Sequence, residues 1–209
     1  MAKIIKKHWD ITVAVGIGLF LTIAGIVGML GMISLPSSVS AATTATATVN
    51  VQATVAETIS ITVSSSIMDL GILTDSTVSA TSNNFTVKTN AGNGYTVTIK
   101  DTGSSTSPGL WKSSAPTNLI PSITATPLTA GSQGYGAQGT STAMGIYSPY
   151  NVSGNNVGQL QITTQNFASS SSATAGAQAT LTLKATISAT TTAGAYSDNP
   201  LTLTAVGSF

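Results

Sequence analysis

Few side chains in this sequence are able to do nucleophilic, acid–base or metal chemistry. The 209 residues include no cysteine, and the one histidine is His8. A Ser-His-Asp system needs a histidine, and most zinc sites need histidine or cysteine, so neither is available beyond residue 8. The lack of cysteine also excludes disulfides and thiolate chemistry. We therefore expect no enzyme, no metal centre and no cofactor.

The carboxylates of the sequence are scattered rather than clustered. After the first 41 residues the acidic residues are Glu57, Asp69, Asp75, Asp101 and Asp198. Two carboxylates can hydrolyse a glycosidic bond, and carboxylates together with carbonyl groups bind calcium. No Asp-x-Asp cluster is present, however, and most of these residues fall where turns are expected. We expect Asp198 to fix a turn by bonding to nearby backbone.

Charge is scarce along the whole chain. Charged residues make up 6% of the sequence, against about 25% in an ordinary soluble domain. After residue 41 the four lysines, Lys88, Lys100, Lys112 and Lys184, stand against five acids, which gives a net charge of −1. Nucleic-acid binding needs a basic stripe, so we expect no nucleic-acid partner. The polar surface must come from Thr, Ser, Asn and Gln, which suits a protein outside the cell.

The first 41 residues have the features of an export signal. Three lysines precede an apolar run over residues 11–35, and small residues then favour cleavage after Ala41 or Ala42. The run also exceeds the roughly 20 apolar residues that span a bilayer, so it could be retained as an N-terminal hydrophobic helix. In both cases the lysines place the N-terminus in the cytoplasm and the rest outside. We expect an extracellular or cell-surface protein that meets the membrane only through this segment.

Alternation of apolar and polar residues dominates the chain after residue 41. Apolar residues take every second position from Ala45 to Val55, and the same parity returns from Ile59 to Val63. This period is typical of half-buried strands. Further strands are expected at residues 67–73, 85–89, 95–99, 157–164, 181–187 and 201–205, with a hairpin at Asn90–Gly94. We predict that residues 42–209 form a single all-β domain, an antiparallel β-sandwich of about nine strands that is Ig-like or jelly-roll-like.

The middle of the chain, residues 102–156, is rich in Gly, Ser, Pro and Asn. This composition predicts a loop-rich insertion with two or three short strands. Its aromatic residues are Trp111, Tyr135, Tyr147 and Tyr150. Aromatic side chains on loops can stack on sugar rings, so these are candidate ligand contacts, and the alternative is a small cluster packed under a loop. One hypothesis is therefore a monomeric adhesin or glycan-binding module.

Three short sequence motifs resemble motifs of bacterial surface proteins. The phrase from Ala193 to Asp198, followed by the alternating residues 201–204, resembles the final hairpin of fimbrial subunits and spore coat protein U-like domains. Asp69-Leu70-Gly71 resembles an early strand of such domains, and residues 94–99 are similar to a central strand of WxL-type domains. The resemblance implies an exported surface β-sandwich.

The phrase that begins at Ala193 also has a structural interpretation of its own. We expect Gly194, Tyr196 and Asp198 to shape a turn. In this interpretation the Tyr196 hydroxyl bonds to backbone, as in a tyrosine corner.

The segment from Thr44 to Val55 suggests how such a protein could assemble. It is an alternating strand pattern at the free start of the exported chain, and such a strand can pair with the sheet of another subunit. The alternative is an ordinary first strand in its own sheet. Our main hypothesis is a non-enzymatic surface structural protein, a pilus or fibre subunit assembled by N-terminal strand exchange, whose partners are copies of itself or other cell-surface molecules.

Overall fold

The structure is a computed structural model that describes residues 44–209 except positions 105, 125 and 199. The predicted export segment, with its apolar run and cleavage positions, lies outside the described residues. Within the part that is described, no helix is long and apolar enough to cross a membrane. The chain divides into two compact units, Met1–Val51 and Gln52–Phe209.

The unit Gln52–Phe209 is built from antiparallel strands, so the predicted all-β class is confirmed. No helix occurs in the described residues of this unit. Its strands are β1 (Ile59–Val63), β2 (Ser79–Thr89), β3 (Tyr95–Lys100), β4 (Gly109–Lys112), β5 (Ala115–Pro121), β6 (Gly134–Thr140), β7 (Gly145–Ile146), β8 (Gln165–Ser170), β9 (Thr174–Thr186) and β10 (Thr202–Gly207).

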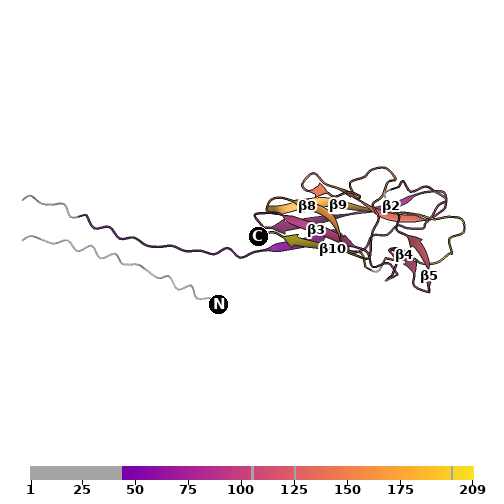
Figure 1. The fold of residues 1–209 in the computed structure, drawn as a ribbon, viewed down its shortest axis with the longest axis horizontal. Coiled ribbons are helices and arrows are strands. Elements are labelled where there is room, and N and C mark those ends of the chain that lie inside the picture. The colour runs from indigo at the N-terminus through magenta and orange to yellow at the C-terminus, as the bar shows by residue number, and fades with distance from the viewer. Residues whose placement is uncertain (1–43, 105, 125, 199) are drawn as a thin grey trace, which may run out of the picture. The chain divides into compact units, whose positions relative to one another are not determined.

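Two four-stranded sheets form a sandwich-like arrangement. One sheet has the order β1-β2-β9-β6, and the other has the order β10-β3-β8-β7. Strands β4 and β5 pair with each other and lie at the end remote from the C-terminus (Figure 1). Buried side chains from both sheets and from this hairpin join in one core cluster. The core therefore lies between the sheets, and each sheet has an outer face towards solvent.

The long strands β2 and β9 form the spine of the first sheet. Their register pairs residues 79–87 of β2 with residues 177–185 of β9. On the outer face the Ser82 and Thr182 hydroxyls are 2.8 Å apart, and the Thr180 hydroxyl donates to the Asn84 side-chain oxygen at 2.7 Å. Neutral hydroxyl and amide groups thus make this face polar, where most proteins use charged side chains, as the composition suggested.

Aromatic rings fill the centre of the core. The ring centroids of Phe85 and Phe167 are 5.8 Å apart, and those of Tyr150 and Phe167 are 5.2 Å apart. All three side chains are buried, and the tilted ring geometries are favourable for aromatic pairs. Tyr150 ties the core to a loop, because its hydroxyl donates to the Gln159 carbonyl at 2.9 Å.

Two predicted hairpins are wrong, because the chain crosses between the sheets at both places. The turn at Asn90–Gly94 connects β2 in one sheet to β3 in the other. Gly94 has φ +86°, and a Cβ there would lie 2.0 Å from the Ser170 carbonyl oxygen, so only glycine fits this crossing. The segment between β9 and β10, expected as the final hairpin, also joins strands of different sheets.

Two predicted strands are absent, and the middle of the chain holds more strands than expected. Residues 67–73 lie outside any strand, and residues 157–164 make only an isolated bridge at Gly158. Apolar side chains in these stretches reach the core without pairing their backbone, as Val157 and Leu160 do. Residues 102–156 contain four strands, β4 to β7, where two or three were expected.

Candidate functional site

The alternating segment that precedes β1 is exposed to solvent and pairs with no strand of the described residues. Residues 44–57 lie outside any strand, and each of them is exposed. The exposed fractions of Val49, Val51 and Val55 are 82%, 88% and 82%. The prediction of a half-buried strand from Ala45 to Val55 is therefore wrong for the folded chain. The pattern that produced the prediction remains, with apolar side chains at every odd position and no partner among the described residues.

The Asn90 side chain holds the chain extended just before β1. Its amide oxygen accepts a hydrogen bond from the Thr58 N–H at 2.8 Å, and its amide nitrogen donates to the Ala56 carbonyl at 2.7 Å. The Asn90 backbone N–H donates to the Thr58 carbonyl at 3.3 Å. These bonds continue the line of β1 back to Ala56.

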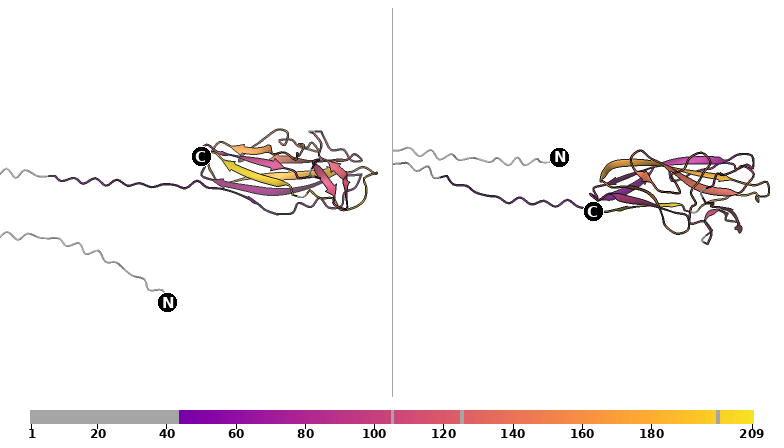
Figure 2. Two further views of the ribbon diagram at one scale, coloured as in Figure 1. Left: turned by 60° about the horizontal axis from the view of Figure 1, so that its bottom comes forward. Right: turned by 45° about the horizontal axis from the view of Figure 1, so that its top comes forward.

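Both sheets end in an open edge on the same side of the unit. Strand β1 is the edge of its sheet, and β10 is the edge of the other. The two edge strands lie next to one another (Figure 2). A free edge presents unpaired backbone N–H and C=O groups that another strand can use. The two sheets are therefore adjacent along the β1–β10 side, but no strand pairing joins them there.

An apolar groove opens between these edges. It has a volume of about 1100 Å³ and reaches from the edge strands down to the core. Its walls combine aliphatic side chains of β1 and β9 with those of β10 and its entry, and the principal ones are Ile61, Val63, Leu181, Leu183, Leu201 and Leu203. No lysine is among its lining residues. The groove therefore suits an uncharged, aliphatic occupant.

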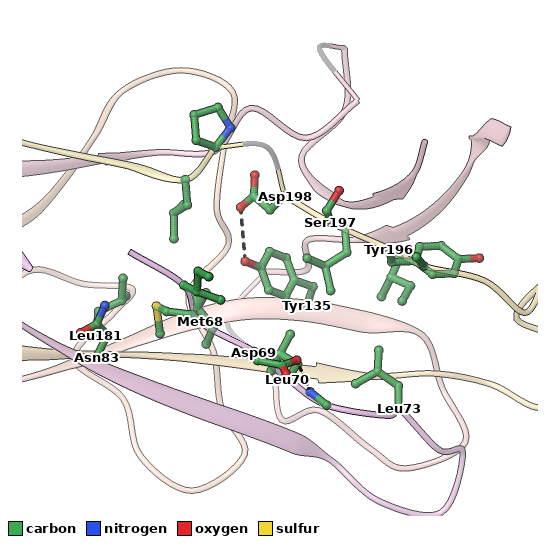
Figure 3. Close-up of a pocket in the computed structure, with 18 of the residues that line it drawn as sticks. Met68, Asp69, Leu70, Leu73, Asn83, Tyr135, Leu181, Tyr196, Ser197 and Asp198 are labelled. Carbon is green, nitrogen blue, oxygen red and sulfur yellow. Dashed lines mark hydrogen bonds between the residues drawn. The ribbon is translucent and has the colours of Figure 1, made fainter. Parts of the chain in front are cut away.

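The segment after β1 forms part of the mouth of the groove. Met68, Leu70 and Leu73 are half-buried and pack against the core from this irregular stretch (Figure 3). Ile67 and Ile72 point outwards and are 75% and 92% exposed. The mouth thus carries solvent-exposed aliphatic side chains in addition to those that pack against the core.

A buried carboxyl pair lies at one end of the groove. Asp101 is fully buried, and its two oxygens accept hydrogen bonds from the backbone N–H groups of Gly103 at 2.6 Å and Gly109 at 2.8 Å. Asp198 lies on the groove wall and accepts a hydrogen bond from the Tyr135 hydroxyl at 3.3 Å (Figure 3). Asp101 therefore organises the loop between β3 and β4.

Burial raises the pKa of Asp198 to about 8, and the neighbouring Asp101 carboxylate adds to the rise. A protonated Asp198 can donate to Asp101, which removes the repulsion between two carboxylates. Burial also raises the pKa of Tyr135, and the charges of Asp198 and Asp101 act in the same direction. Asp198 is therefore largely protonated near neutral pH. The contact between the two side chains joins the loop after β3 to the segment before β10.

The aromatic residues singled out in the sequence do not form one surface. Tyr135 and Tyr150 are 0% and 1% exposed and belong to the main core, in β6 and in a loop. Trp111 in β4 is half-buried, and its indole nitrogen is buried without a hydrogen-bond partner. Tyr147 is 39% exposed. Burial of these rings depends on contacts between distant strands, which the local loop-like composition does not reveal.

The predicted turn before β10 is ordered by backbone contacts. The Tyr196 hydroxyl donates to the Thr192 carbonyl at 2.8 Å, and residues 192–198 line the groove. Gly194 has φ +149°, and its Cα faces the Lys112 side chain, whose amine donates to the Ala193 carbonyl at 2.6 Å. The Asp198 side chain turns inwards and accepts a hydrogen bond from the Tyr135 hydroxyl.

Among the residues that the structure describes, no group of three or more His, Asp or Glu side chains is placed to hold a metal ion. No protein-family model, curated protein or solved structure matches the chain. The exposed segment, the open edges and the groove are the features of this chain from which a function can be inferred.

Proposed function

We propose that this protein is an exported structural subunit of a surface fibre, and that residues 44–57 link one subunit to the next. The observation that carries the proposal is the exposure of this segment. It has the side-chain alternation of a sheet strand, yet it lies outside any strand and exposes three valines almost completely. Exposed alternating segments are ready partners for the edge of another sheet.

The chemistry of the chain supports a structural role. The sequence beyond residue 41 has neither histidine nor cysteine, and 6% charged residues overall. We take the two sheets as the layers of a β-sandwich, in keeping with the fimbrial and spore coat protein U-like phrases of the sequence. The predicted signal segment would deliver this domain to the cell surface.

The adhesin alternative has weaker support. It relied on four aromatic residues of the central region as sugar contacts, and Tyr135 and Tyr150 are buried in the core. Trp111 and Tyr147 come from different elements, β4 and the loop after β7. A glycan-binding face would need more exposed aromatic or hydrogen-bonding groups than these two provide.

The test compares a chain that begins at Ala42 with one that begins at Thr58. Size-exclusion chromatography and negative-stain electron microscopy over a range of concentrations report assembly. We expect oligomers or fibres from the longer chain and monomers from the shorter one. Two monomeric proteins at all concentrations would overturn the proposal, and so would fibres from the shorter chain.

A further inference from the structure

We infer that Asn93 is a site of spontaneous chemical modification, at which the side-chain amide cyclises onto the main chain and is then hydrolysed to aspartate or isoaspartate. Asn93 lies in the turn between β2 and β3, and it is the one asparagine of the sequence that is followed by glycine. The turn is not part of the groove lining, and its chemistry does not depend on the proposed assembly.

The reaction needs only the chain and water. The Gly94 main-chain nitrogen bonds to the side-chain carbonyl carbon of Asn93, and the side-chain nitrogen leaves as ammonia with the proton of the Gly94 N–H. Water then opens the five-membered ring at one of its two carbonyl groups. Opening on one side gives aspartate, and opening on the other gives isoaspartate, in which the main chain runs through the former side chain. Because ammonia leaves, the change accumulates with the age of the protein.

The fold requires the residue that makes this reaction easy. Gly94 has φ +86°, and a Cβ there would lie 2.0 Å from the Ser170 carbonyl oxygen, so a side chain is excluded. The nitrogen that attacks Asn93 is therefore unhindered. Its N–H donates to the Ala91 carbonyl at 3.1 Å, and this one bond must open before the attack. Local opening of an exposed turn costs far less free energy than unfolding, so the folded chain slows the reaction without preventing it.

The Asn93 side chain is accessible and weakly held. It is exposed, and a Cβ on the neighbouring Gly92 would have no atom within 4 Å, so water reaches the tip of the turn. The Asn93 amide nitrogen donates to the Phe209 main-chain oxygen at 3.4 Å, a long hydrogen bond. Asn90 differs, because both of its amide atoms are held at 2.8 and 2.7 Å and the next residue is the buried Ala91. One turn thus holds a reactive and a protected asparagine.

The modification acts on the end of β10. The Asn93 N–H donates to the Ser208 carbonyl at 3.1 Å, and the Ser208 N–H donates to the Gly94 carbonyl at 2.8 Å. Isoaspartate inserts one more carbon into the main chain between these two groups of the turn. Gly94 cannot shift to absorb it, because its Cα packs against the Ser170 carbonyl. The two bonds to Ser208 can then no longer form together, and the end of β10 is held less firmly.

The experiment follows the chain that begins at Ala42 during incubation at neutral pH. Trypsin cleaves after the two lysines that flank the turn, so residues 89–100 are released as one peptide that contains both asparagines. Mass spectrometry of its fragments assigns any conversion to Asn93 or Asn90, and a synthetic peptide of the same residues is the unfolded reference. We expect conversion of Asn93 in both samples, more slowly in the folded chain, and an unchanged Asn90 in the folded chain.

Two variants test the chemistry. Asn93→Ser has no amide to cyclise, so its peptide should keep its mass. Gly92→Ala keeps both reacting groups and has space for the added methyl group, so it should still convert. A folded chain whose Asn93 stays intact over several half-lives of the synthetic peptide would overturn the site. Equal conversion of Asn90 in the folded chain would also overturn it, because the turn would then select neither asparagine.

Hydrogen exchange tests the effect on β10. The converted protein has gained a carboxylate, so anion exchange separates it from the parent. We expect the Ser208 amide of the converted protein to exchange about fivefold faster, which corresponds to the loss of one main-chain hydrogen bond. Asn93→Asp carries the same charge on an unaltered main chain and should exchange almost as the parent does. A converted protein with the parent's exchange rate at Ser208 would overturn the loosening of β10.

Discussion

The buried carboxyl pair predicts an unusual dependence of stability on pH. Asp198 has a pKa of about 8 in the folded chain, raised by burial and by the neighbouring Asp101, while an unfolded Asp titrates near about 3.9. Between these values the folded chain keeps a proton that the unfolded chain has released. The free energy of unfolding should therefore fall as the pH rises from about 4 to about 8 and level off above 8.

The size of the effect follows from the difference between the two pKa values, which is about 4. Each pKa unit corresponds to about 1.4 kcal/mol, so complete burial would give about 5 kcal/mol. Asp198 is half-buried, and its residual hydration lowers the expected loss to about 2–4 kcal/mol. That is a large part of the 5–15 kcal/mol that is typical of a folded domain.

The perturbation is Asp198→Asn, which keeps the shape of the protonated acid and its ability to donate to Asp101 without a titrating proton. Urea unfolding of parent and variant between pH 5 and 9 measures the free energy of unfolding. We expect the slope with pH to disappear and the variant to be the more stable protein at pH 8.5. Asp75→Asn, at an exposed position, should leave the slope unchanged. A parent that gains stability between pH 5 and 8, or a variant that keeps the slope, would refute the reasoning.

Three further predictions concern the core, one backbone position and the N-terminal segment. Phe167→Ala should lower the free energy of unfolding by about 3–5 kcal/mol in the same urea assay, because the ring is fully buried. Gly109→Ala should lower it by about 3 kcal/mol, because φ is +138° and the new Cβ would lie 2.2 Å from the Ile120 carbonyl oxygen; an unchanged midpoint would contradict this. A chain that begins at Thr58 should melt at nearly the same temperature as one that begins at Ala42, within about 0.5 kcal/mol of stability, because residues 44–57 bury almost nothing. A large drop would mean that this segment belongs to its own sandwich.

The fold class could be predicted because side-chain alternation is a local property. The odd positions of β2, β3 and β9 that the pattern marked as inward, such as Phe85, Val97 and Leu181, are buried. The pairing of strands could not be predicted in this way. An Asn-Gly turn is compatible with a hairpin and with a crossing between sheets, and the choice depends on distant partners of β2 and β3.

Only part of the candidate site could be predicted from the sequence. The alternation from Ala45 to Val55 predicted a strand and a possible role in assembly, but a local pattern cannot tell whether a partner strand exists in the same chain. The groove depends on two edge strands that are more than a hundred residues apart, β1 and β10. The pairing of Asp101 with Asp198 likewise joins two loops that are remote in sequence, and no local signal near either residue indicates the other.

The hydroxyl and amide pairs on the outer face of β2 and β9 have a consequence for the environment that the domain tolerates. Ser82 with Thr182 and Asn84 with Thr180 hold the face together through neutral hydrogen bonds. Mobile ions screen attraction between charges, but they have little effect on bonds between neutral groups. The folded domain should therefore keep its stability from fresh water to brine, a tolerance that the proposed export to the cell surface would require.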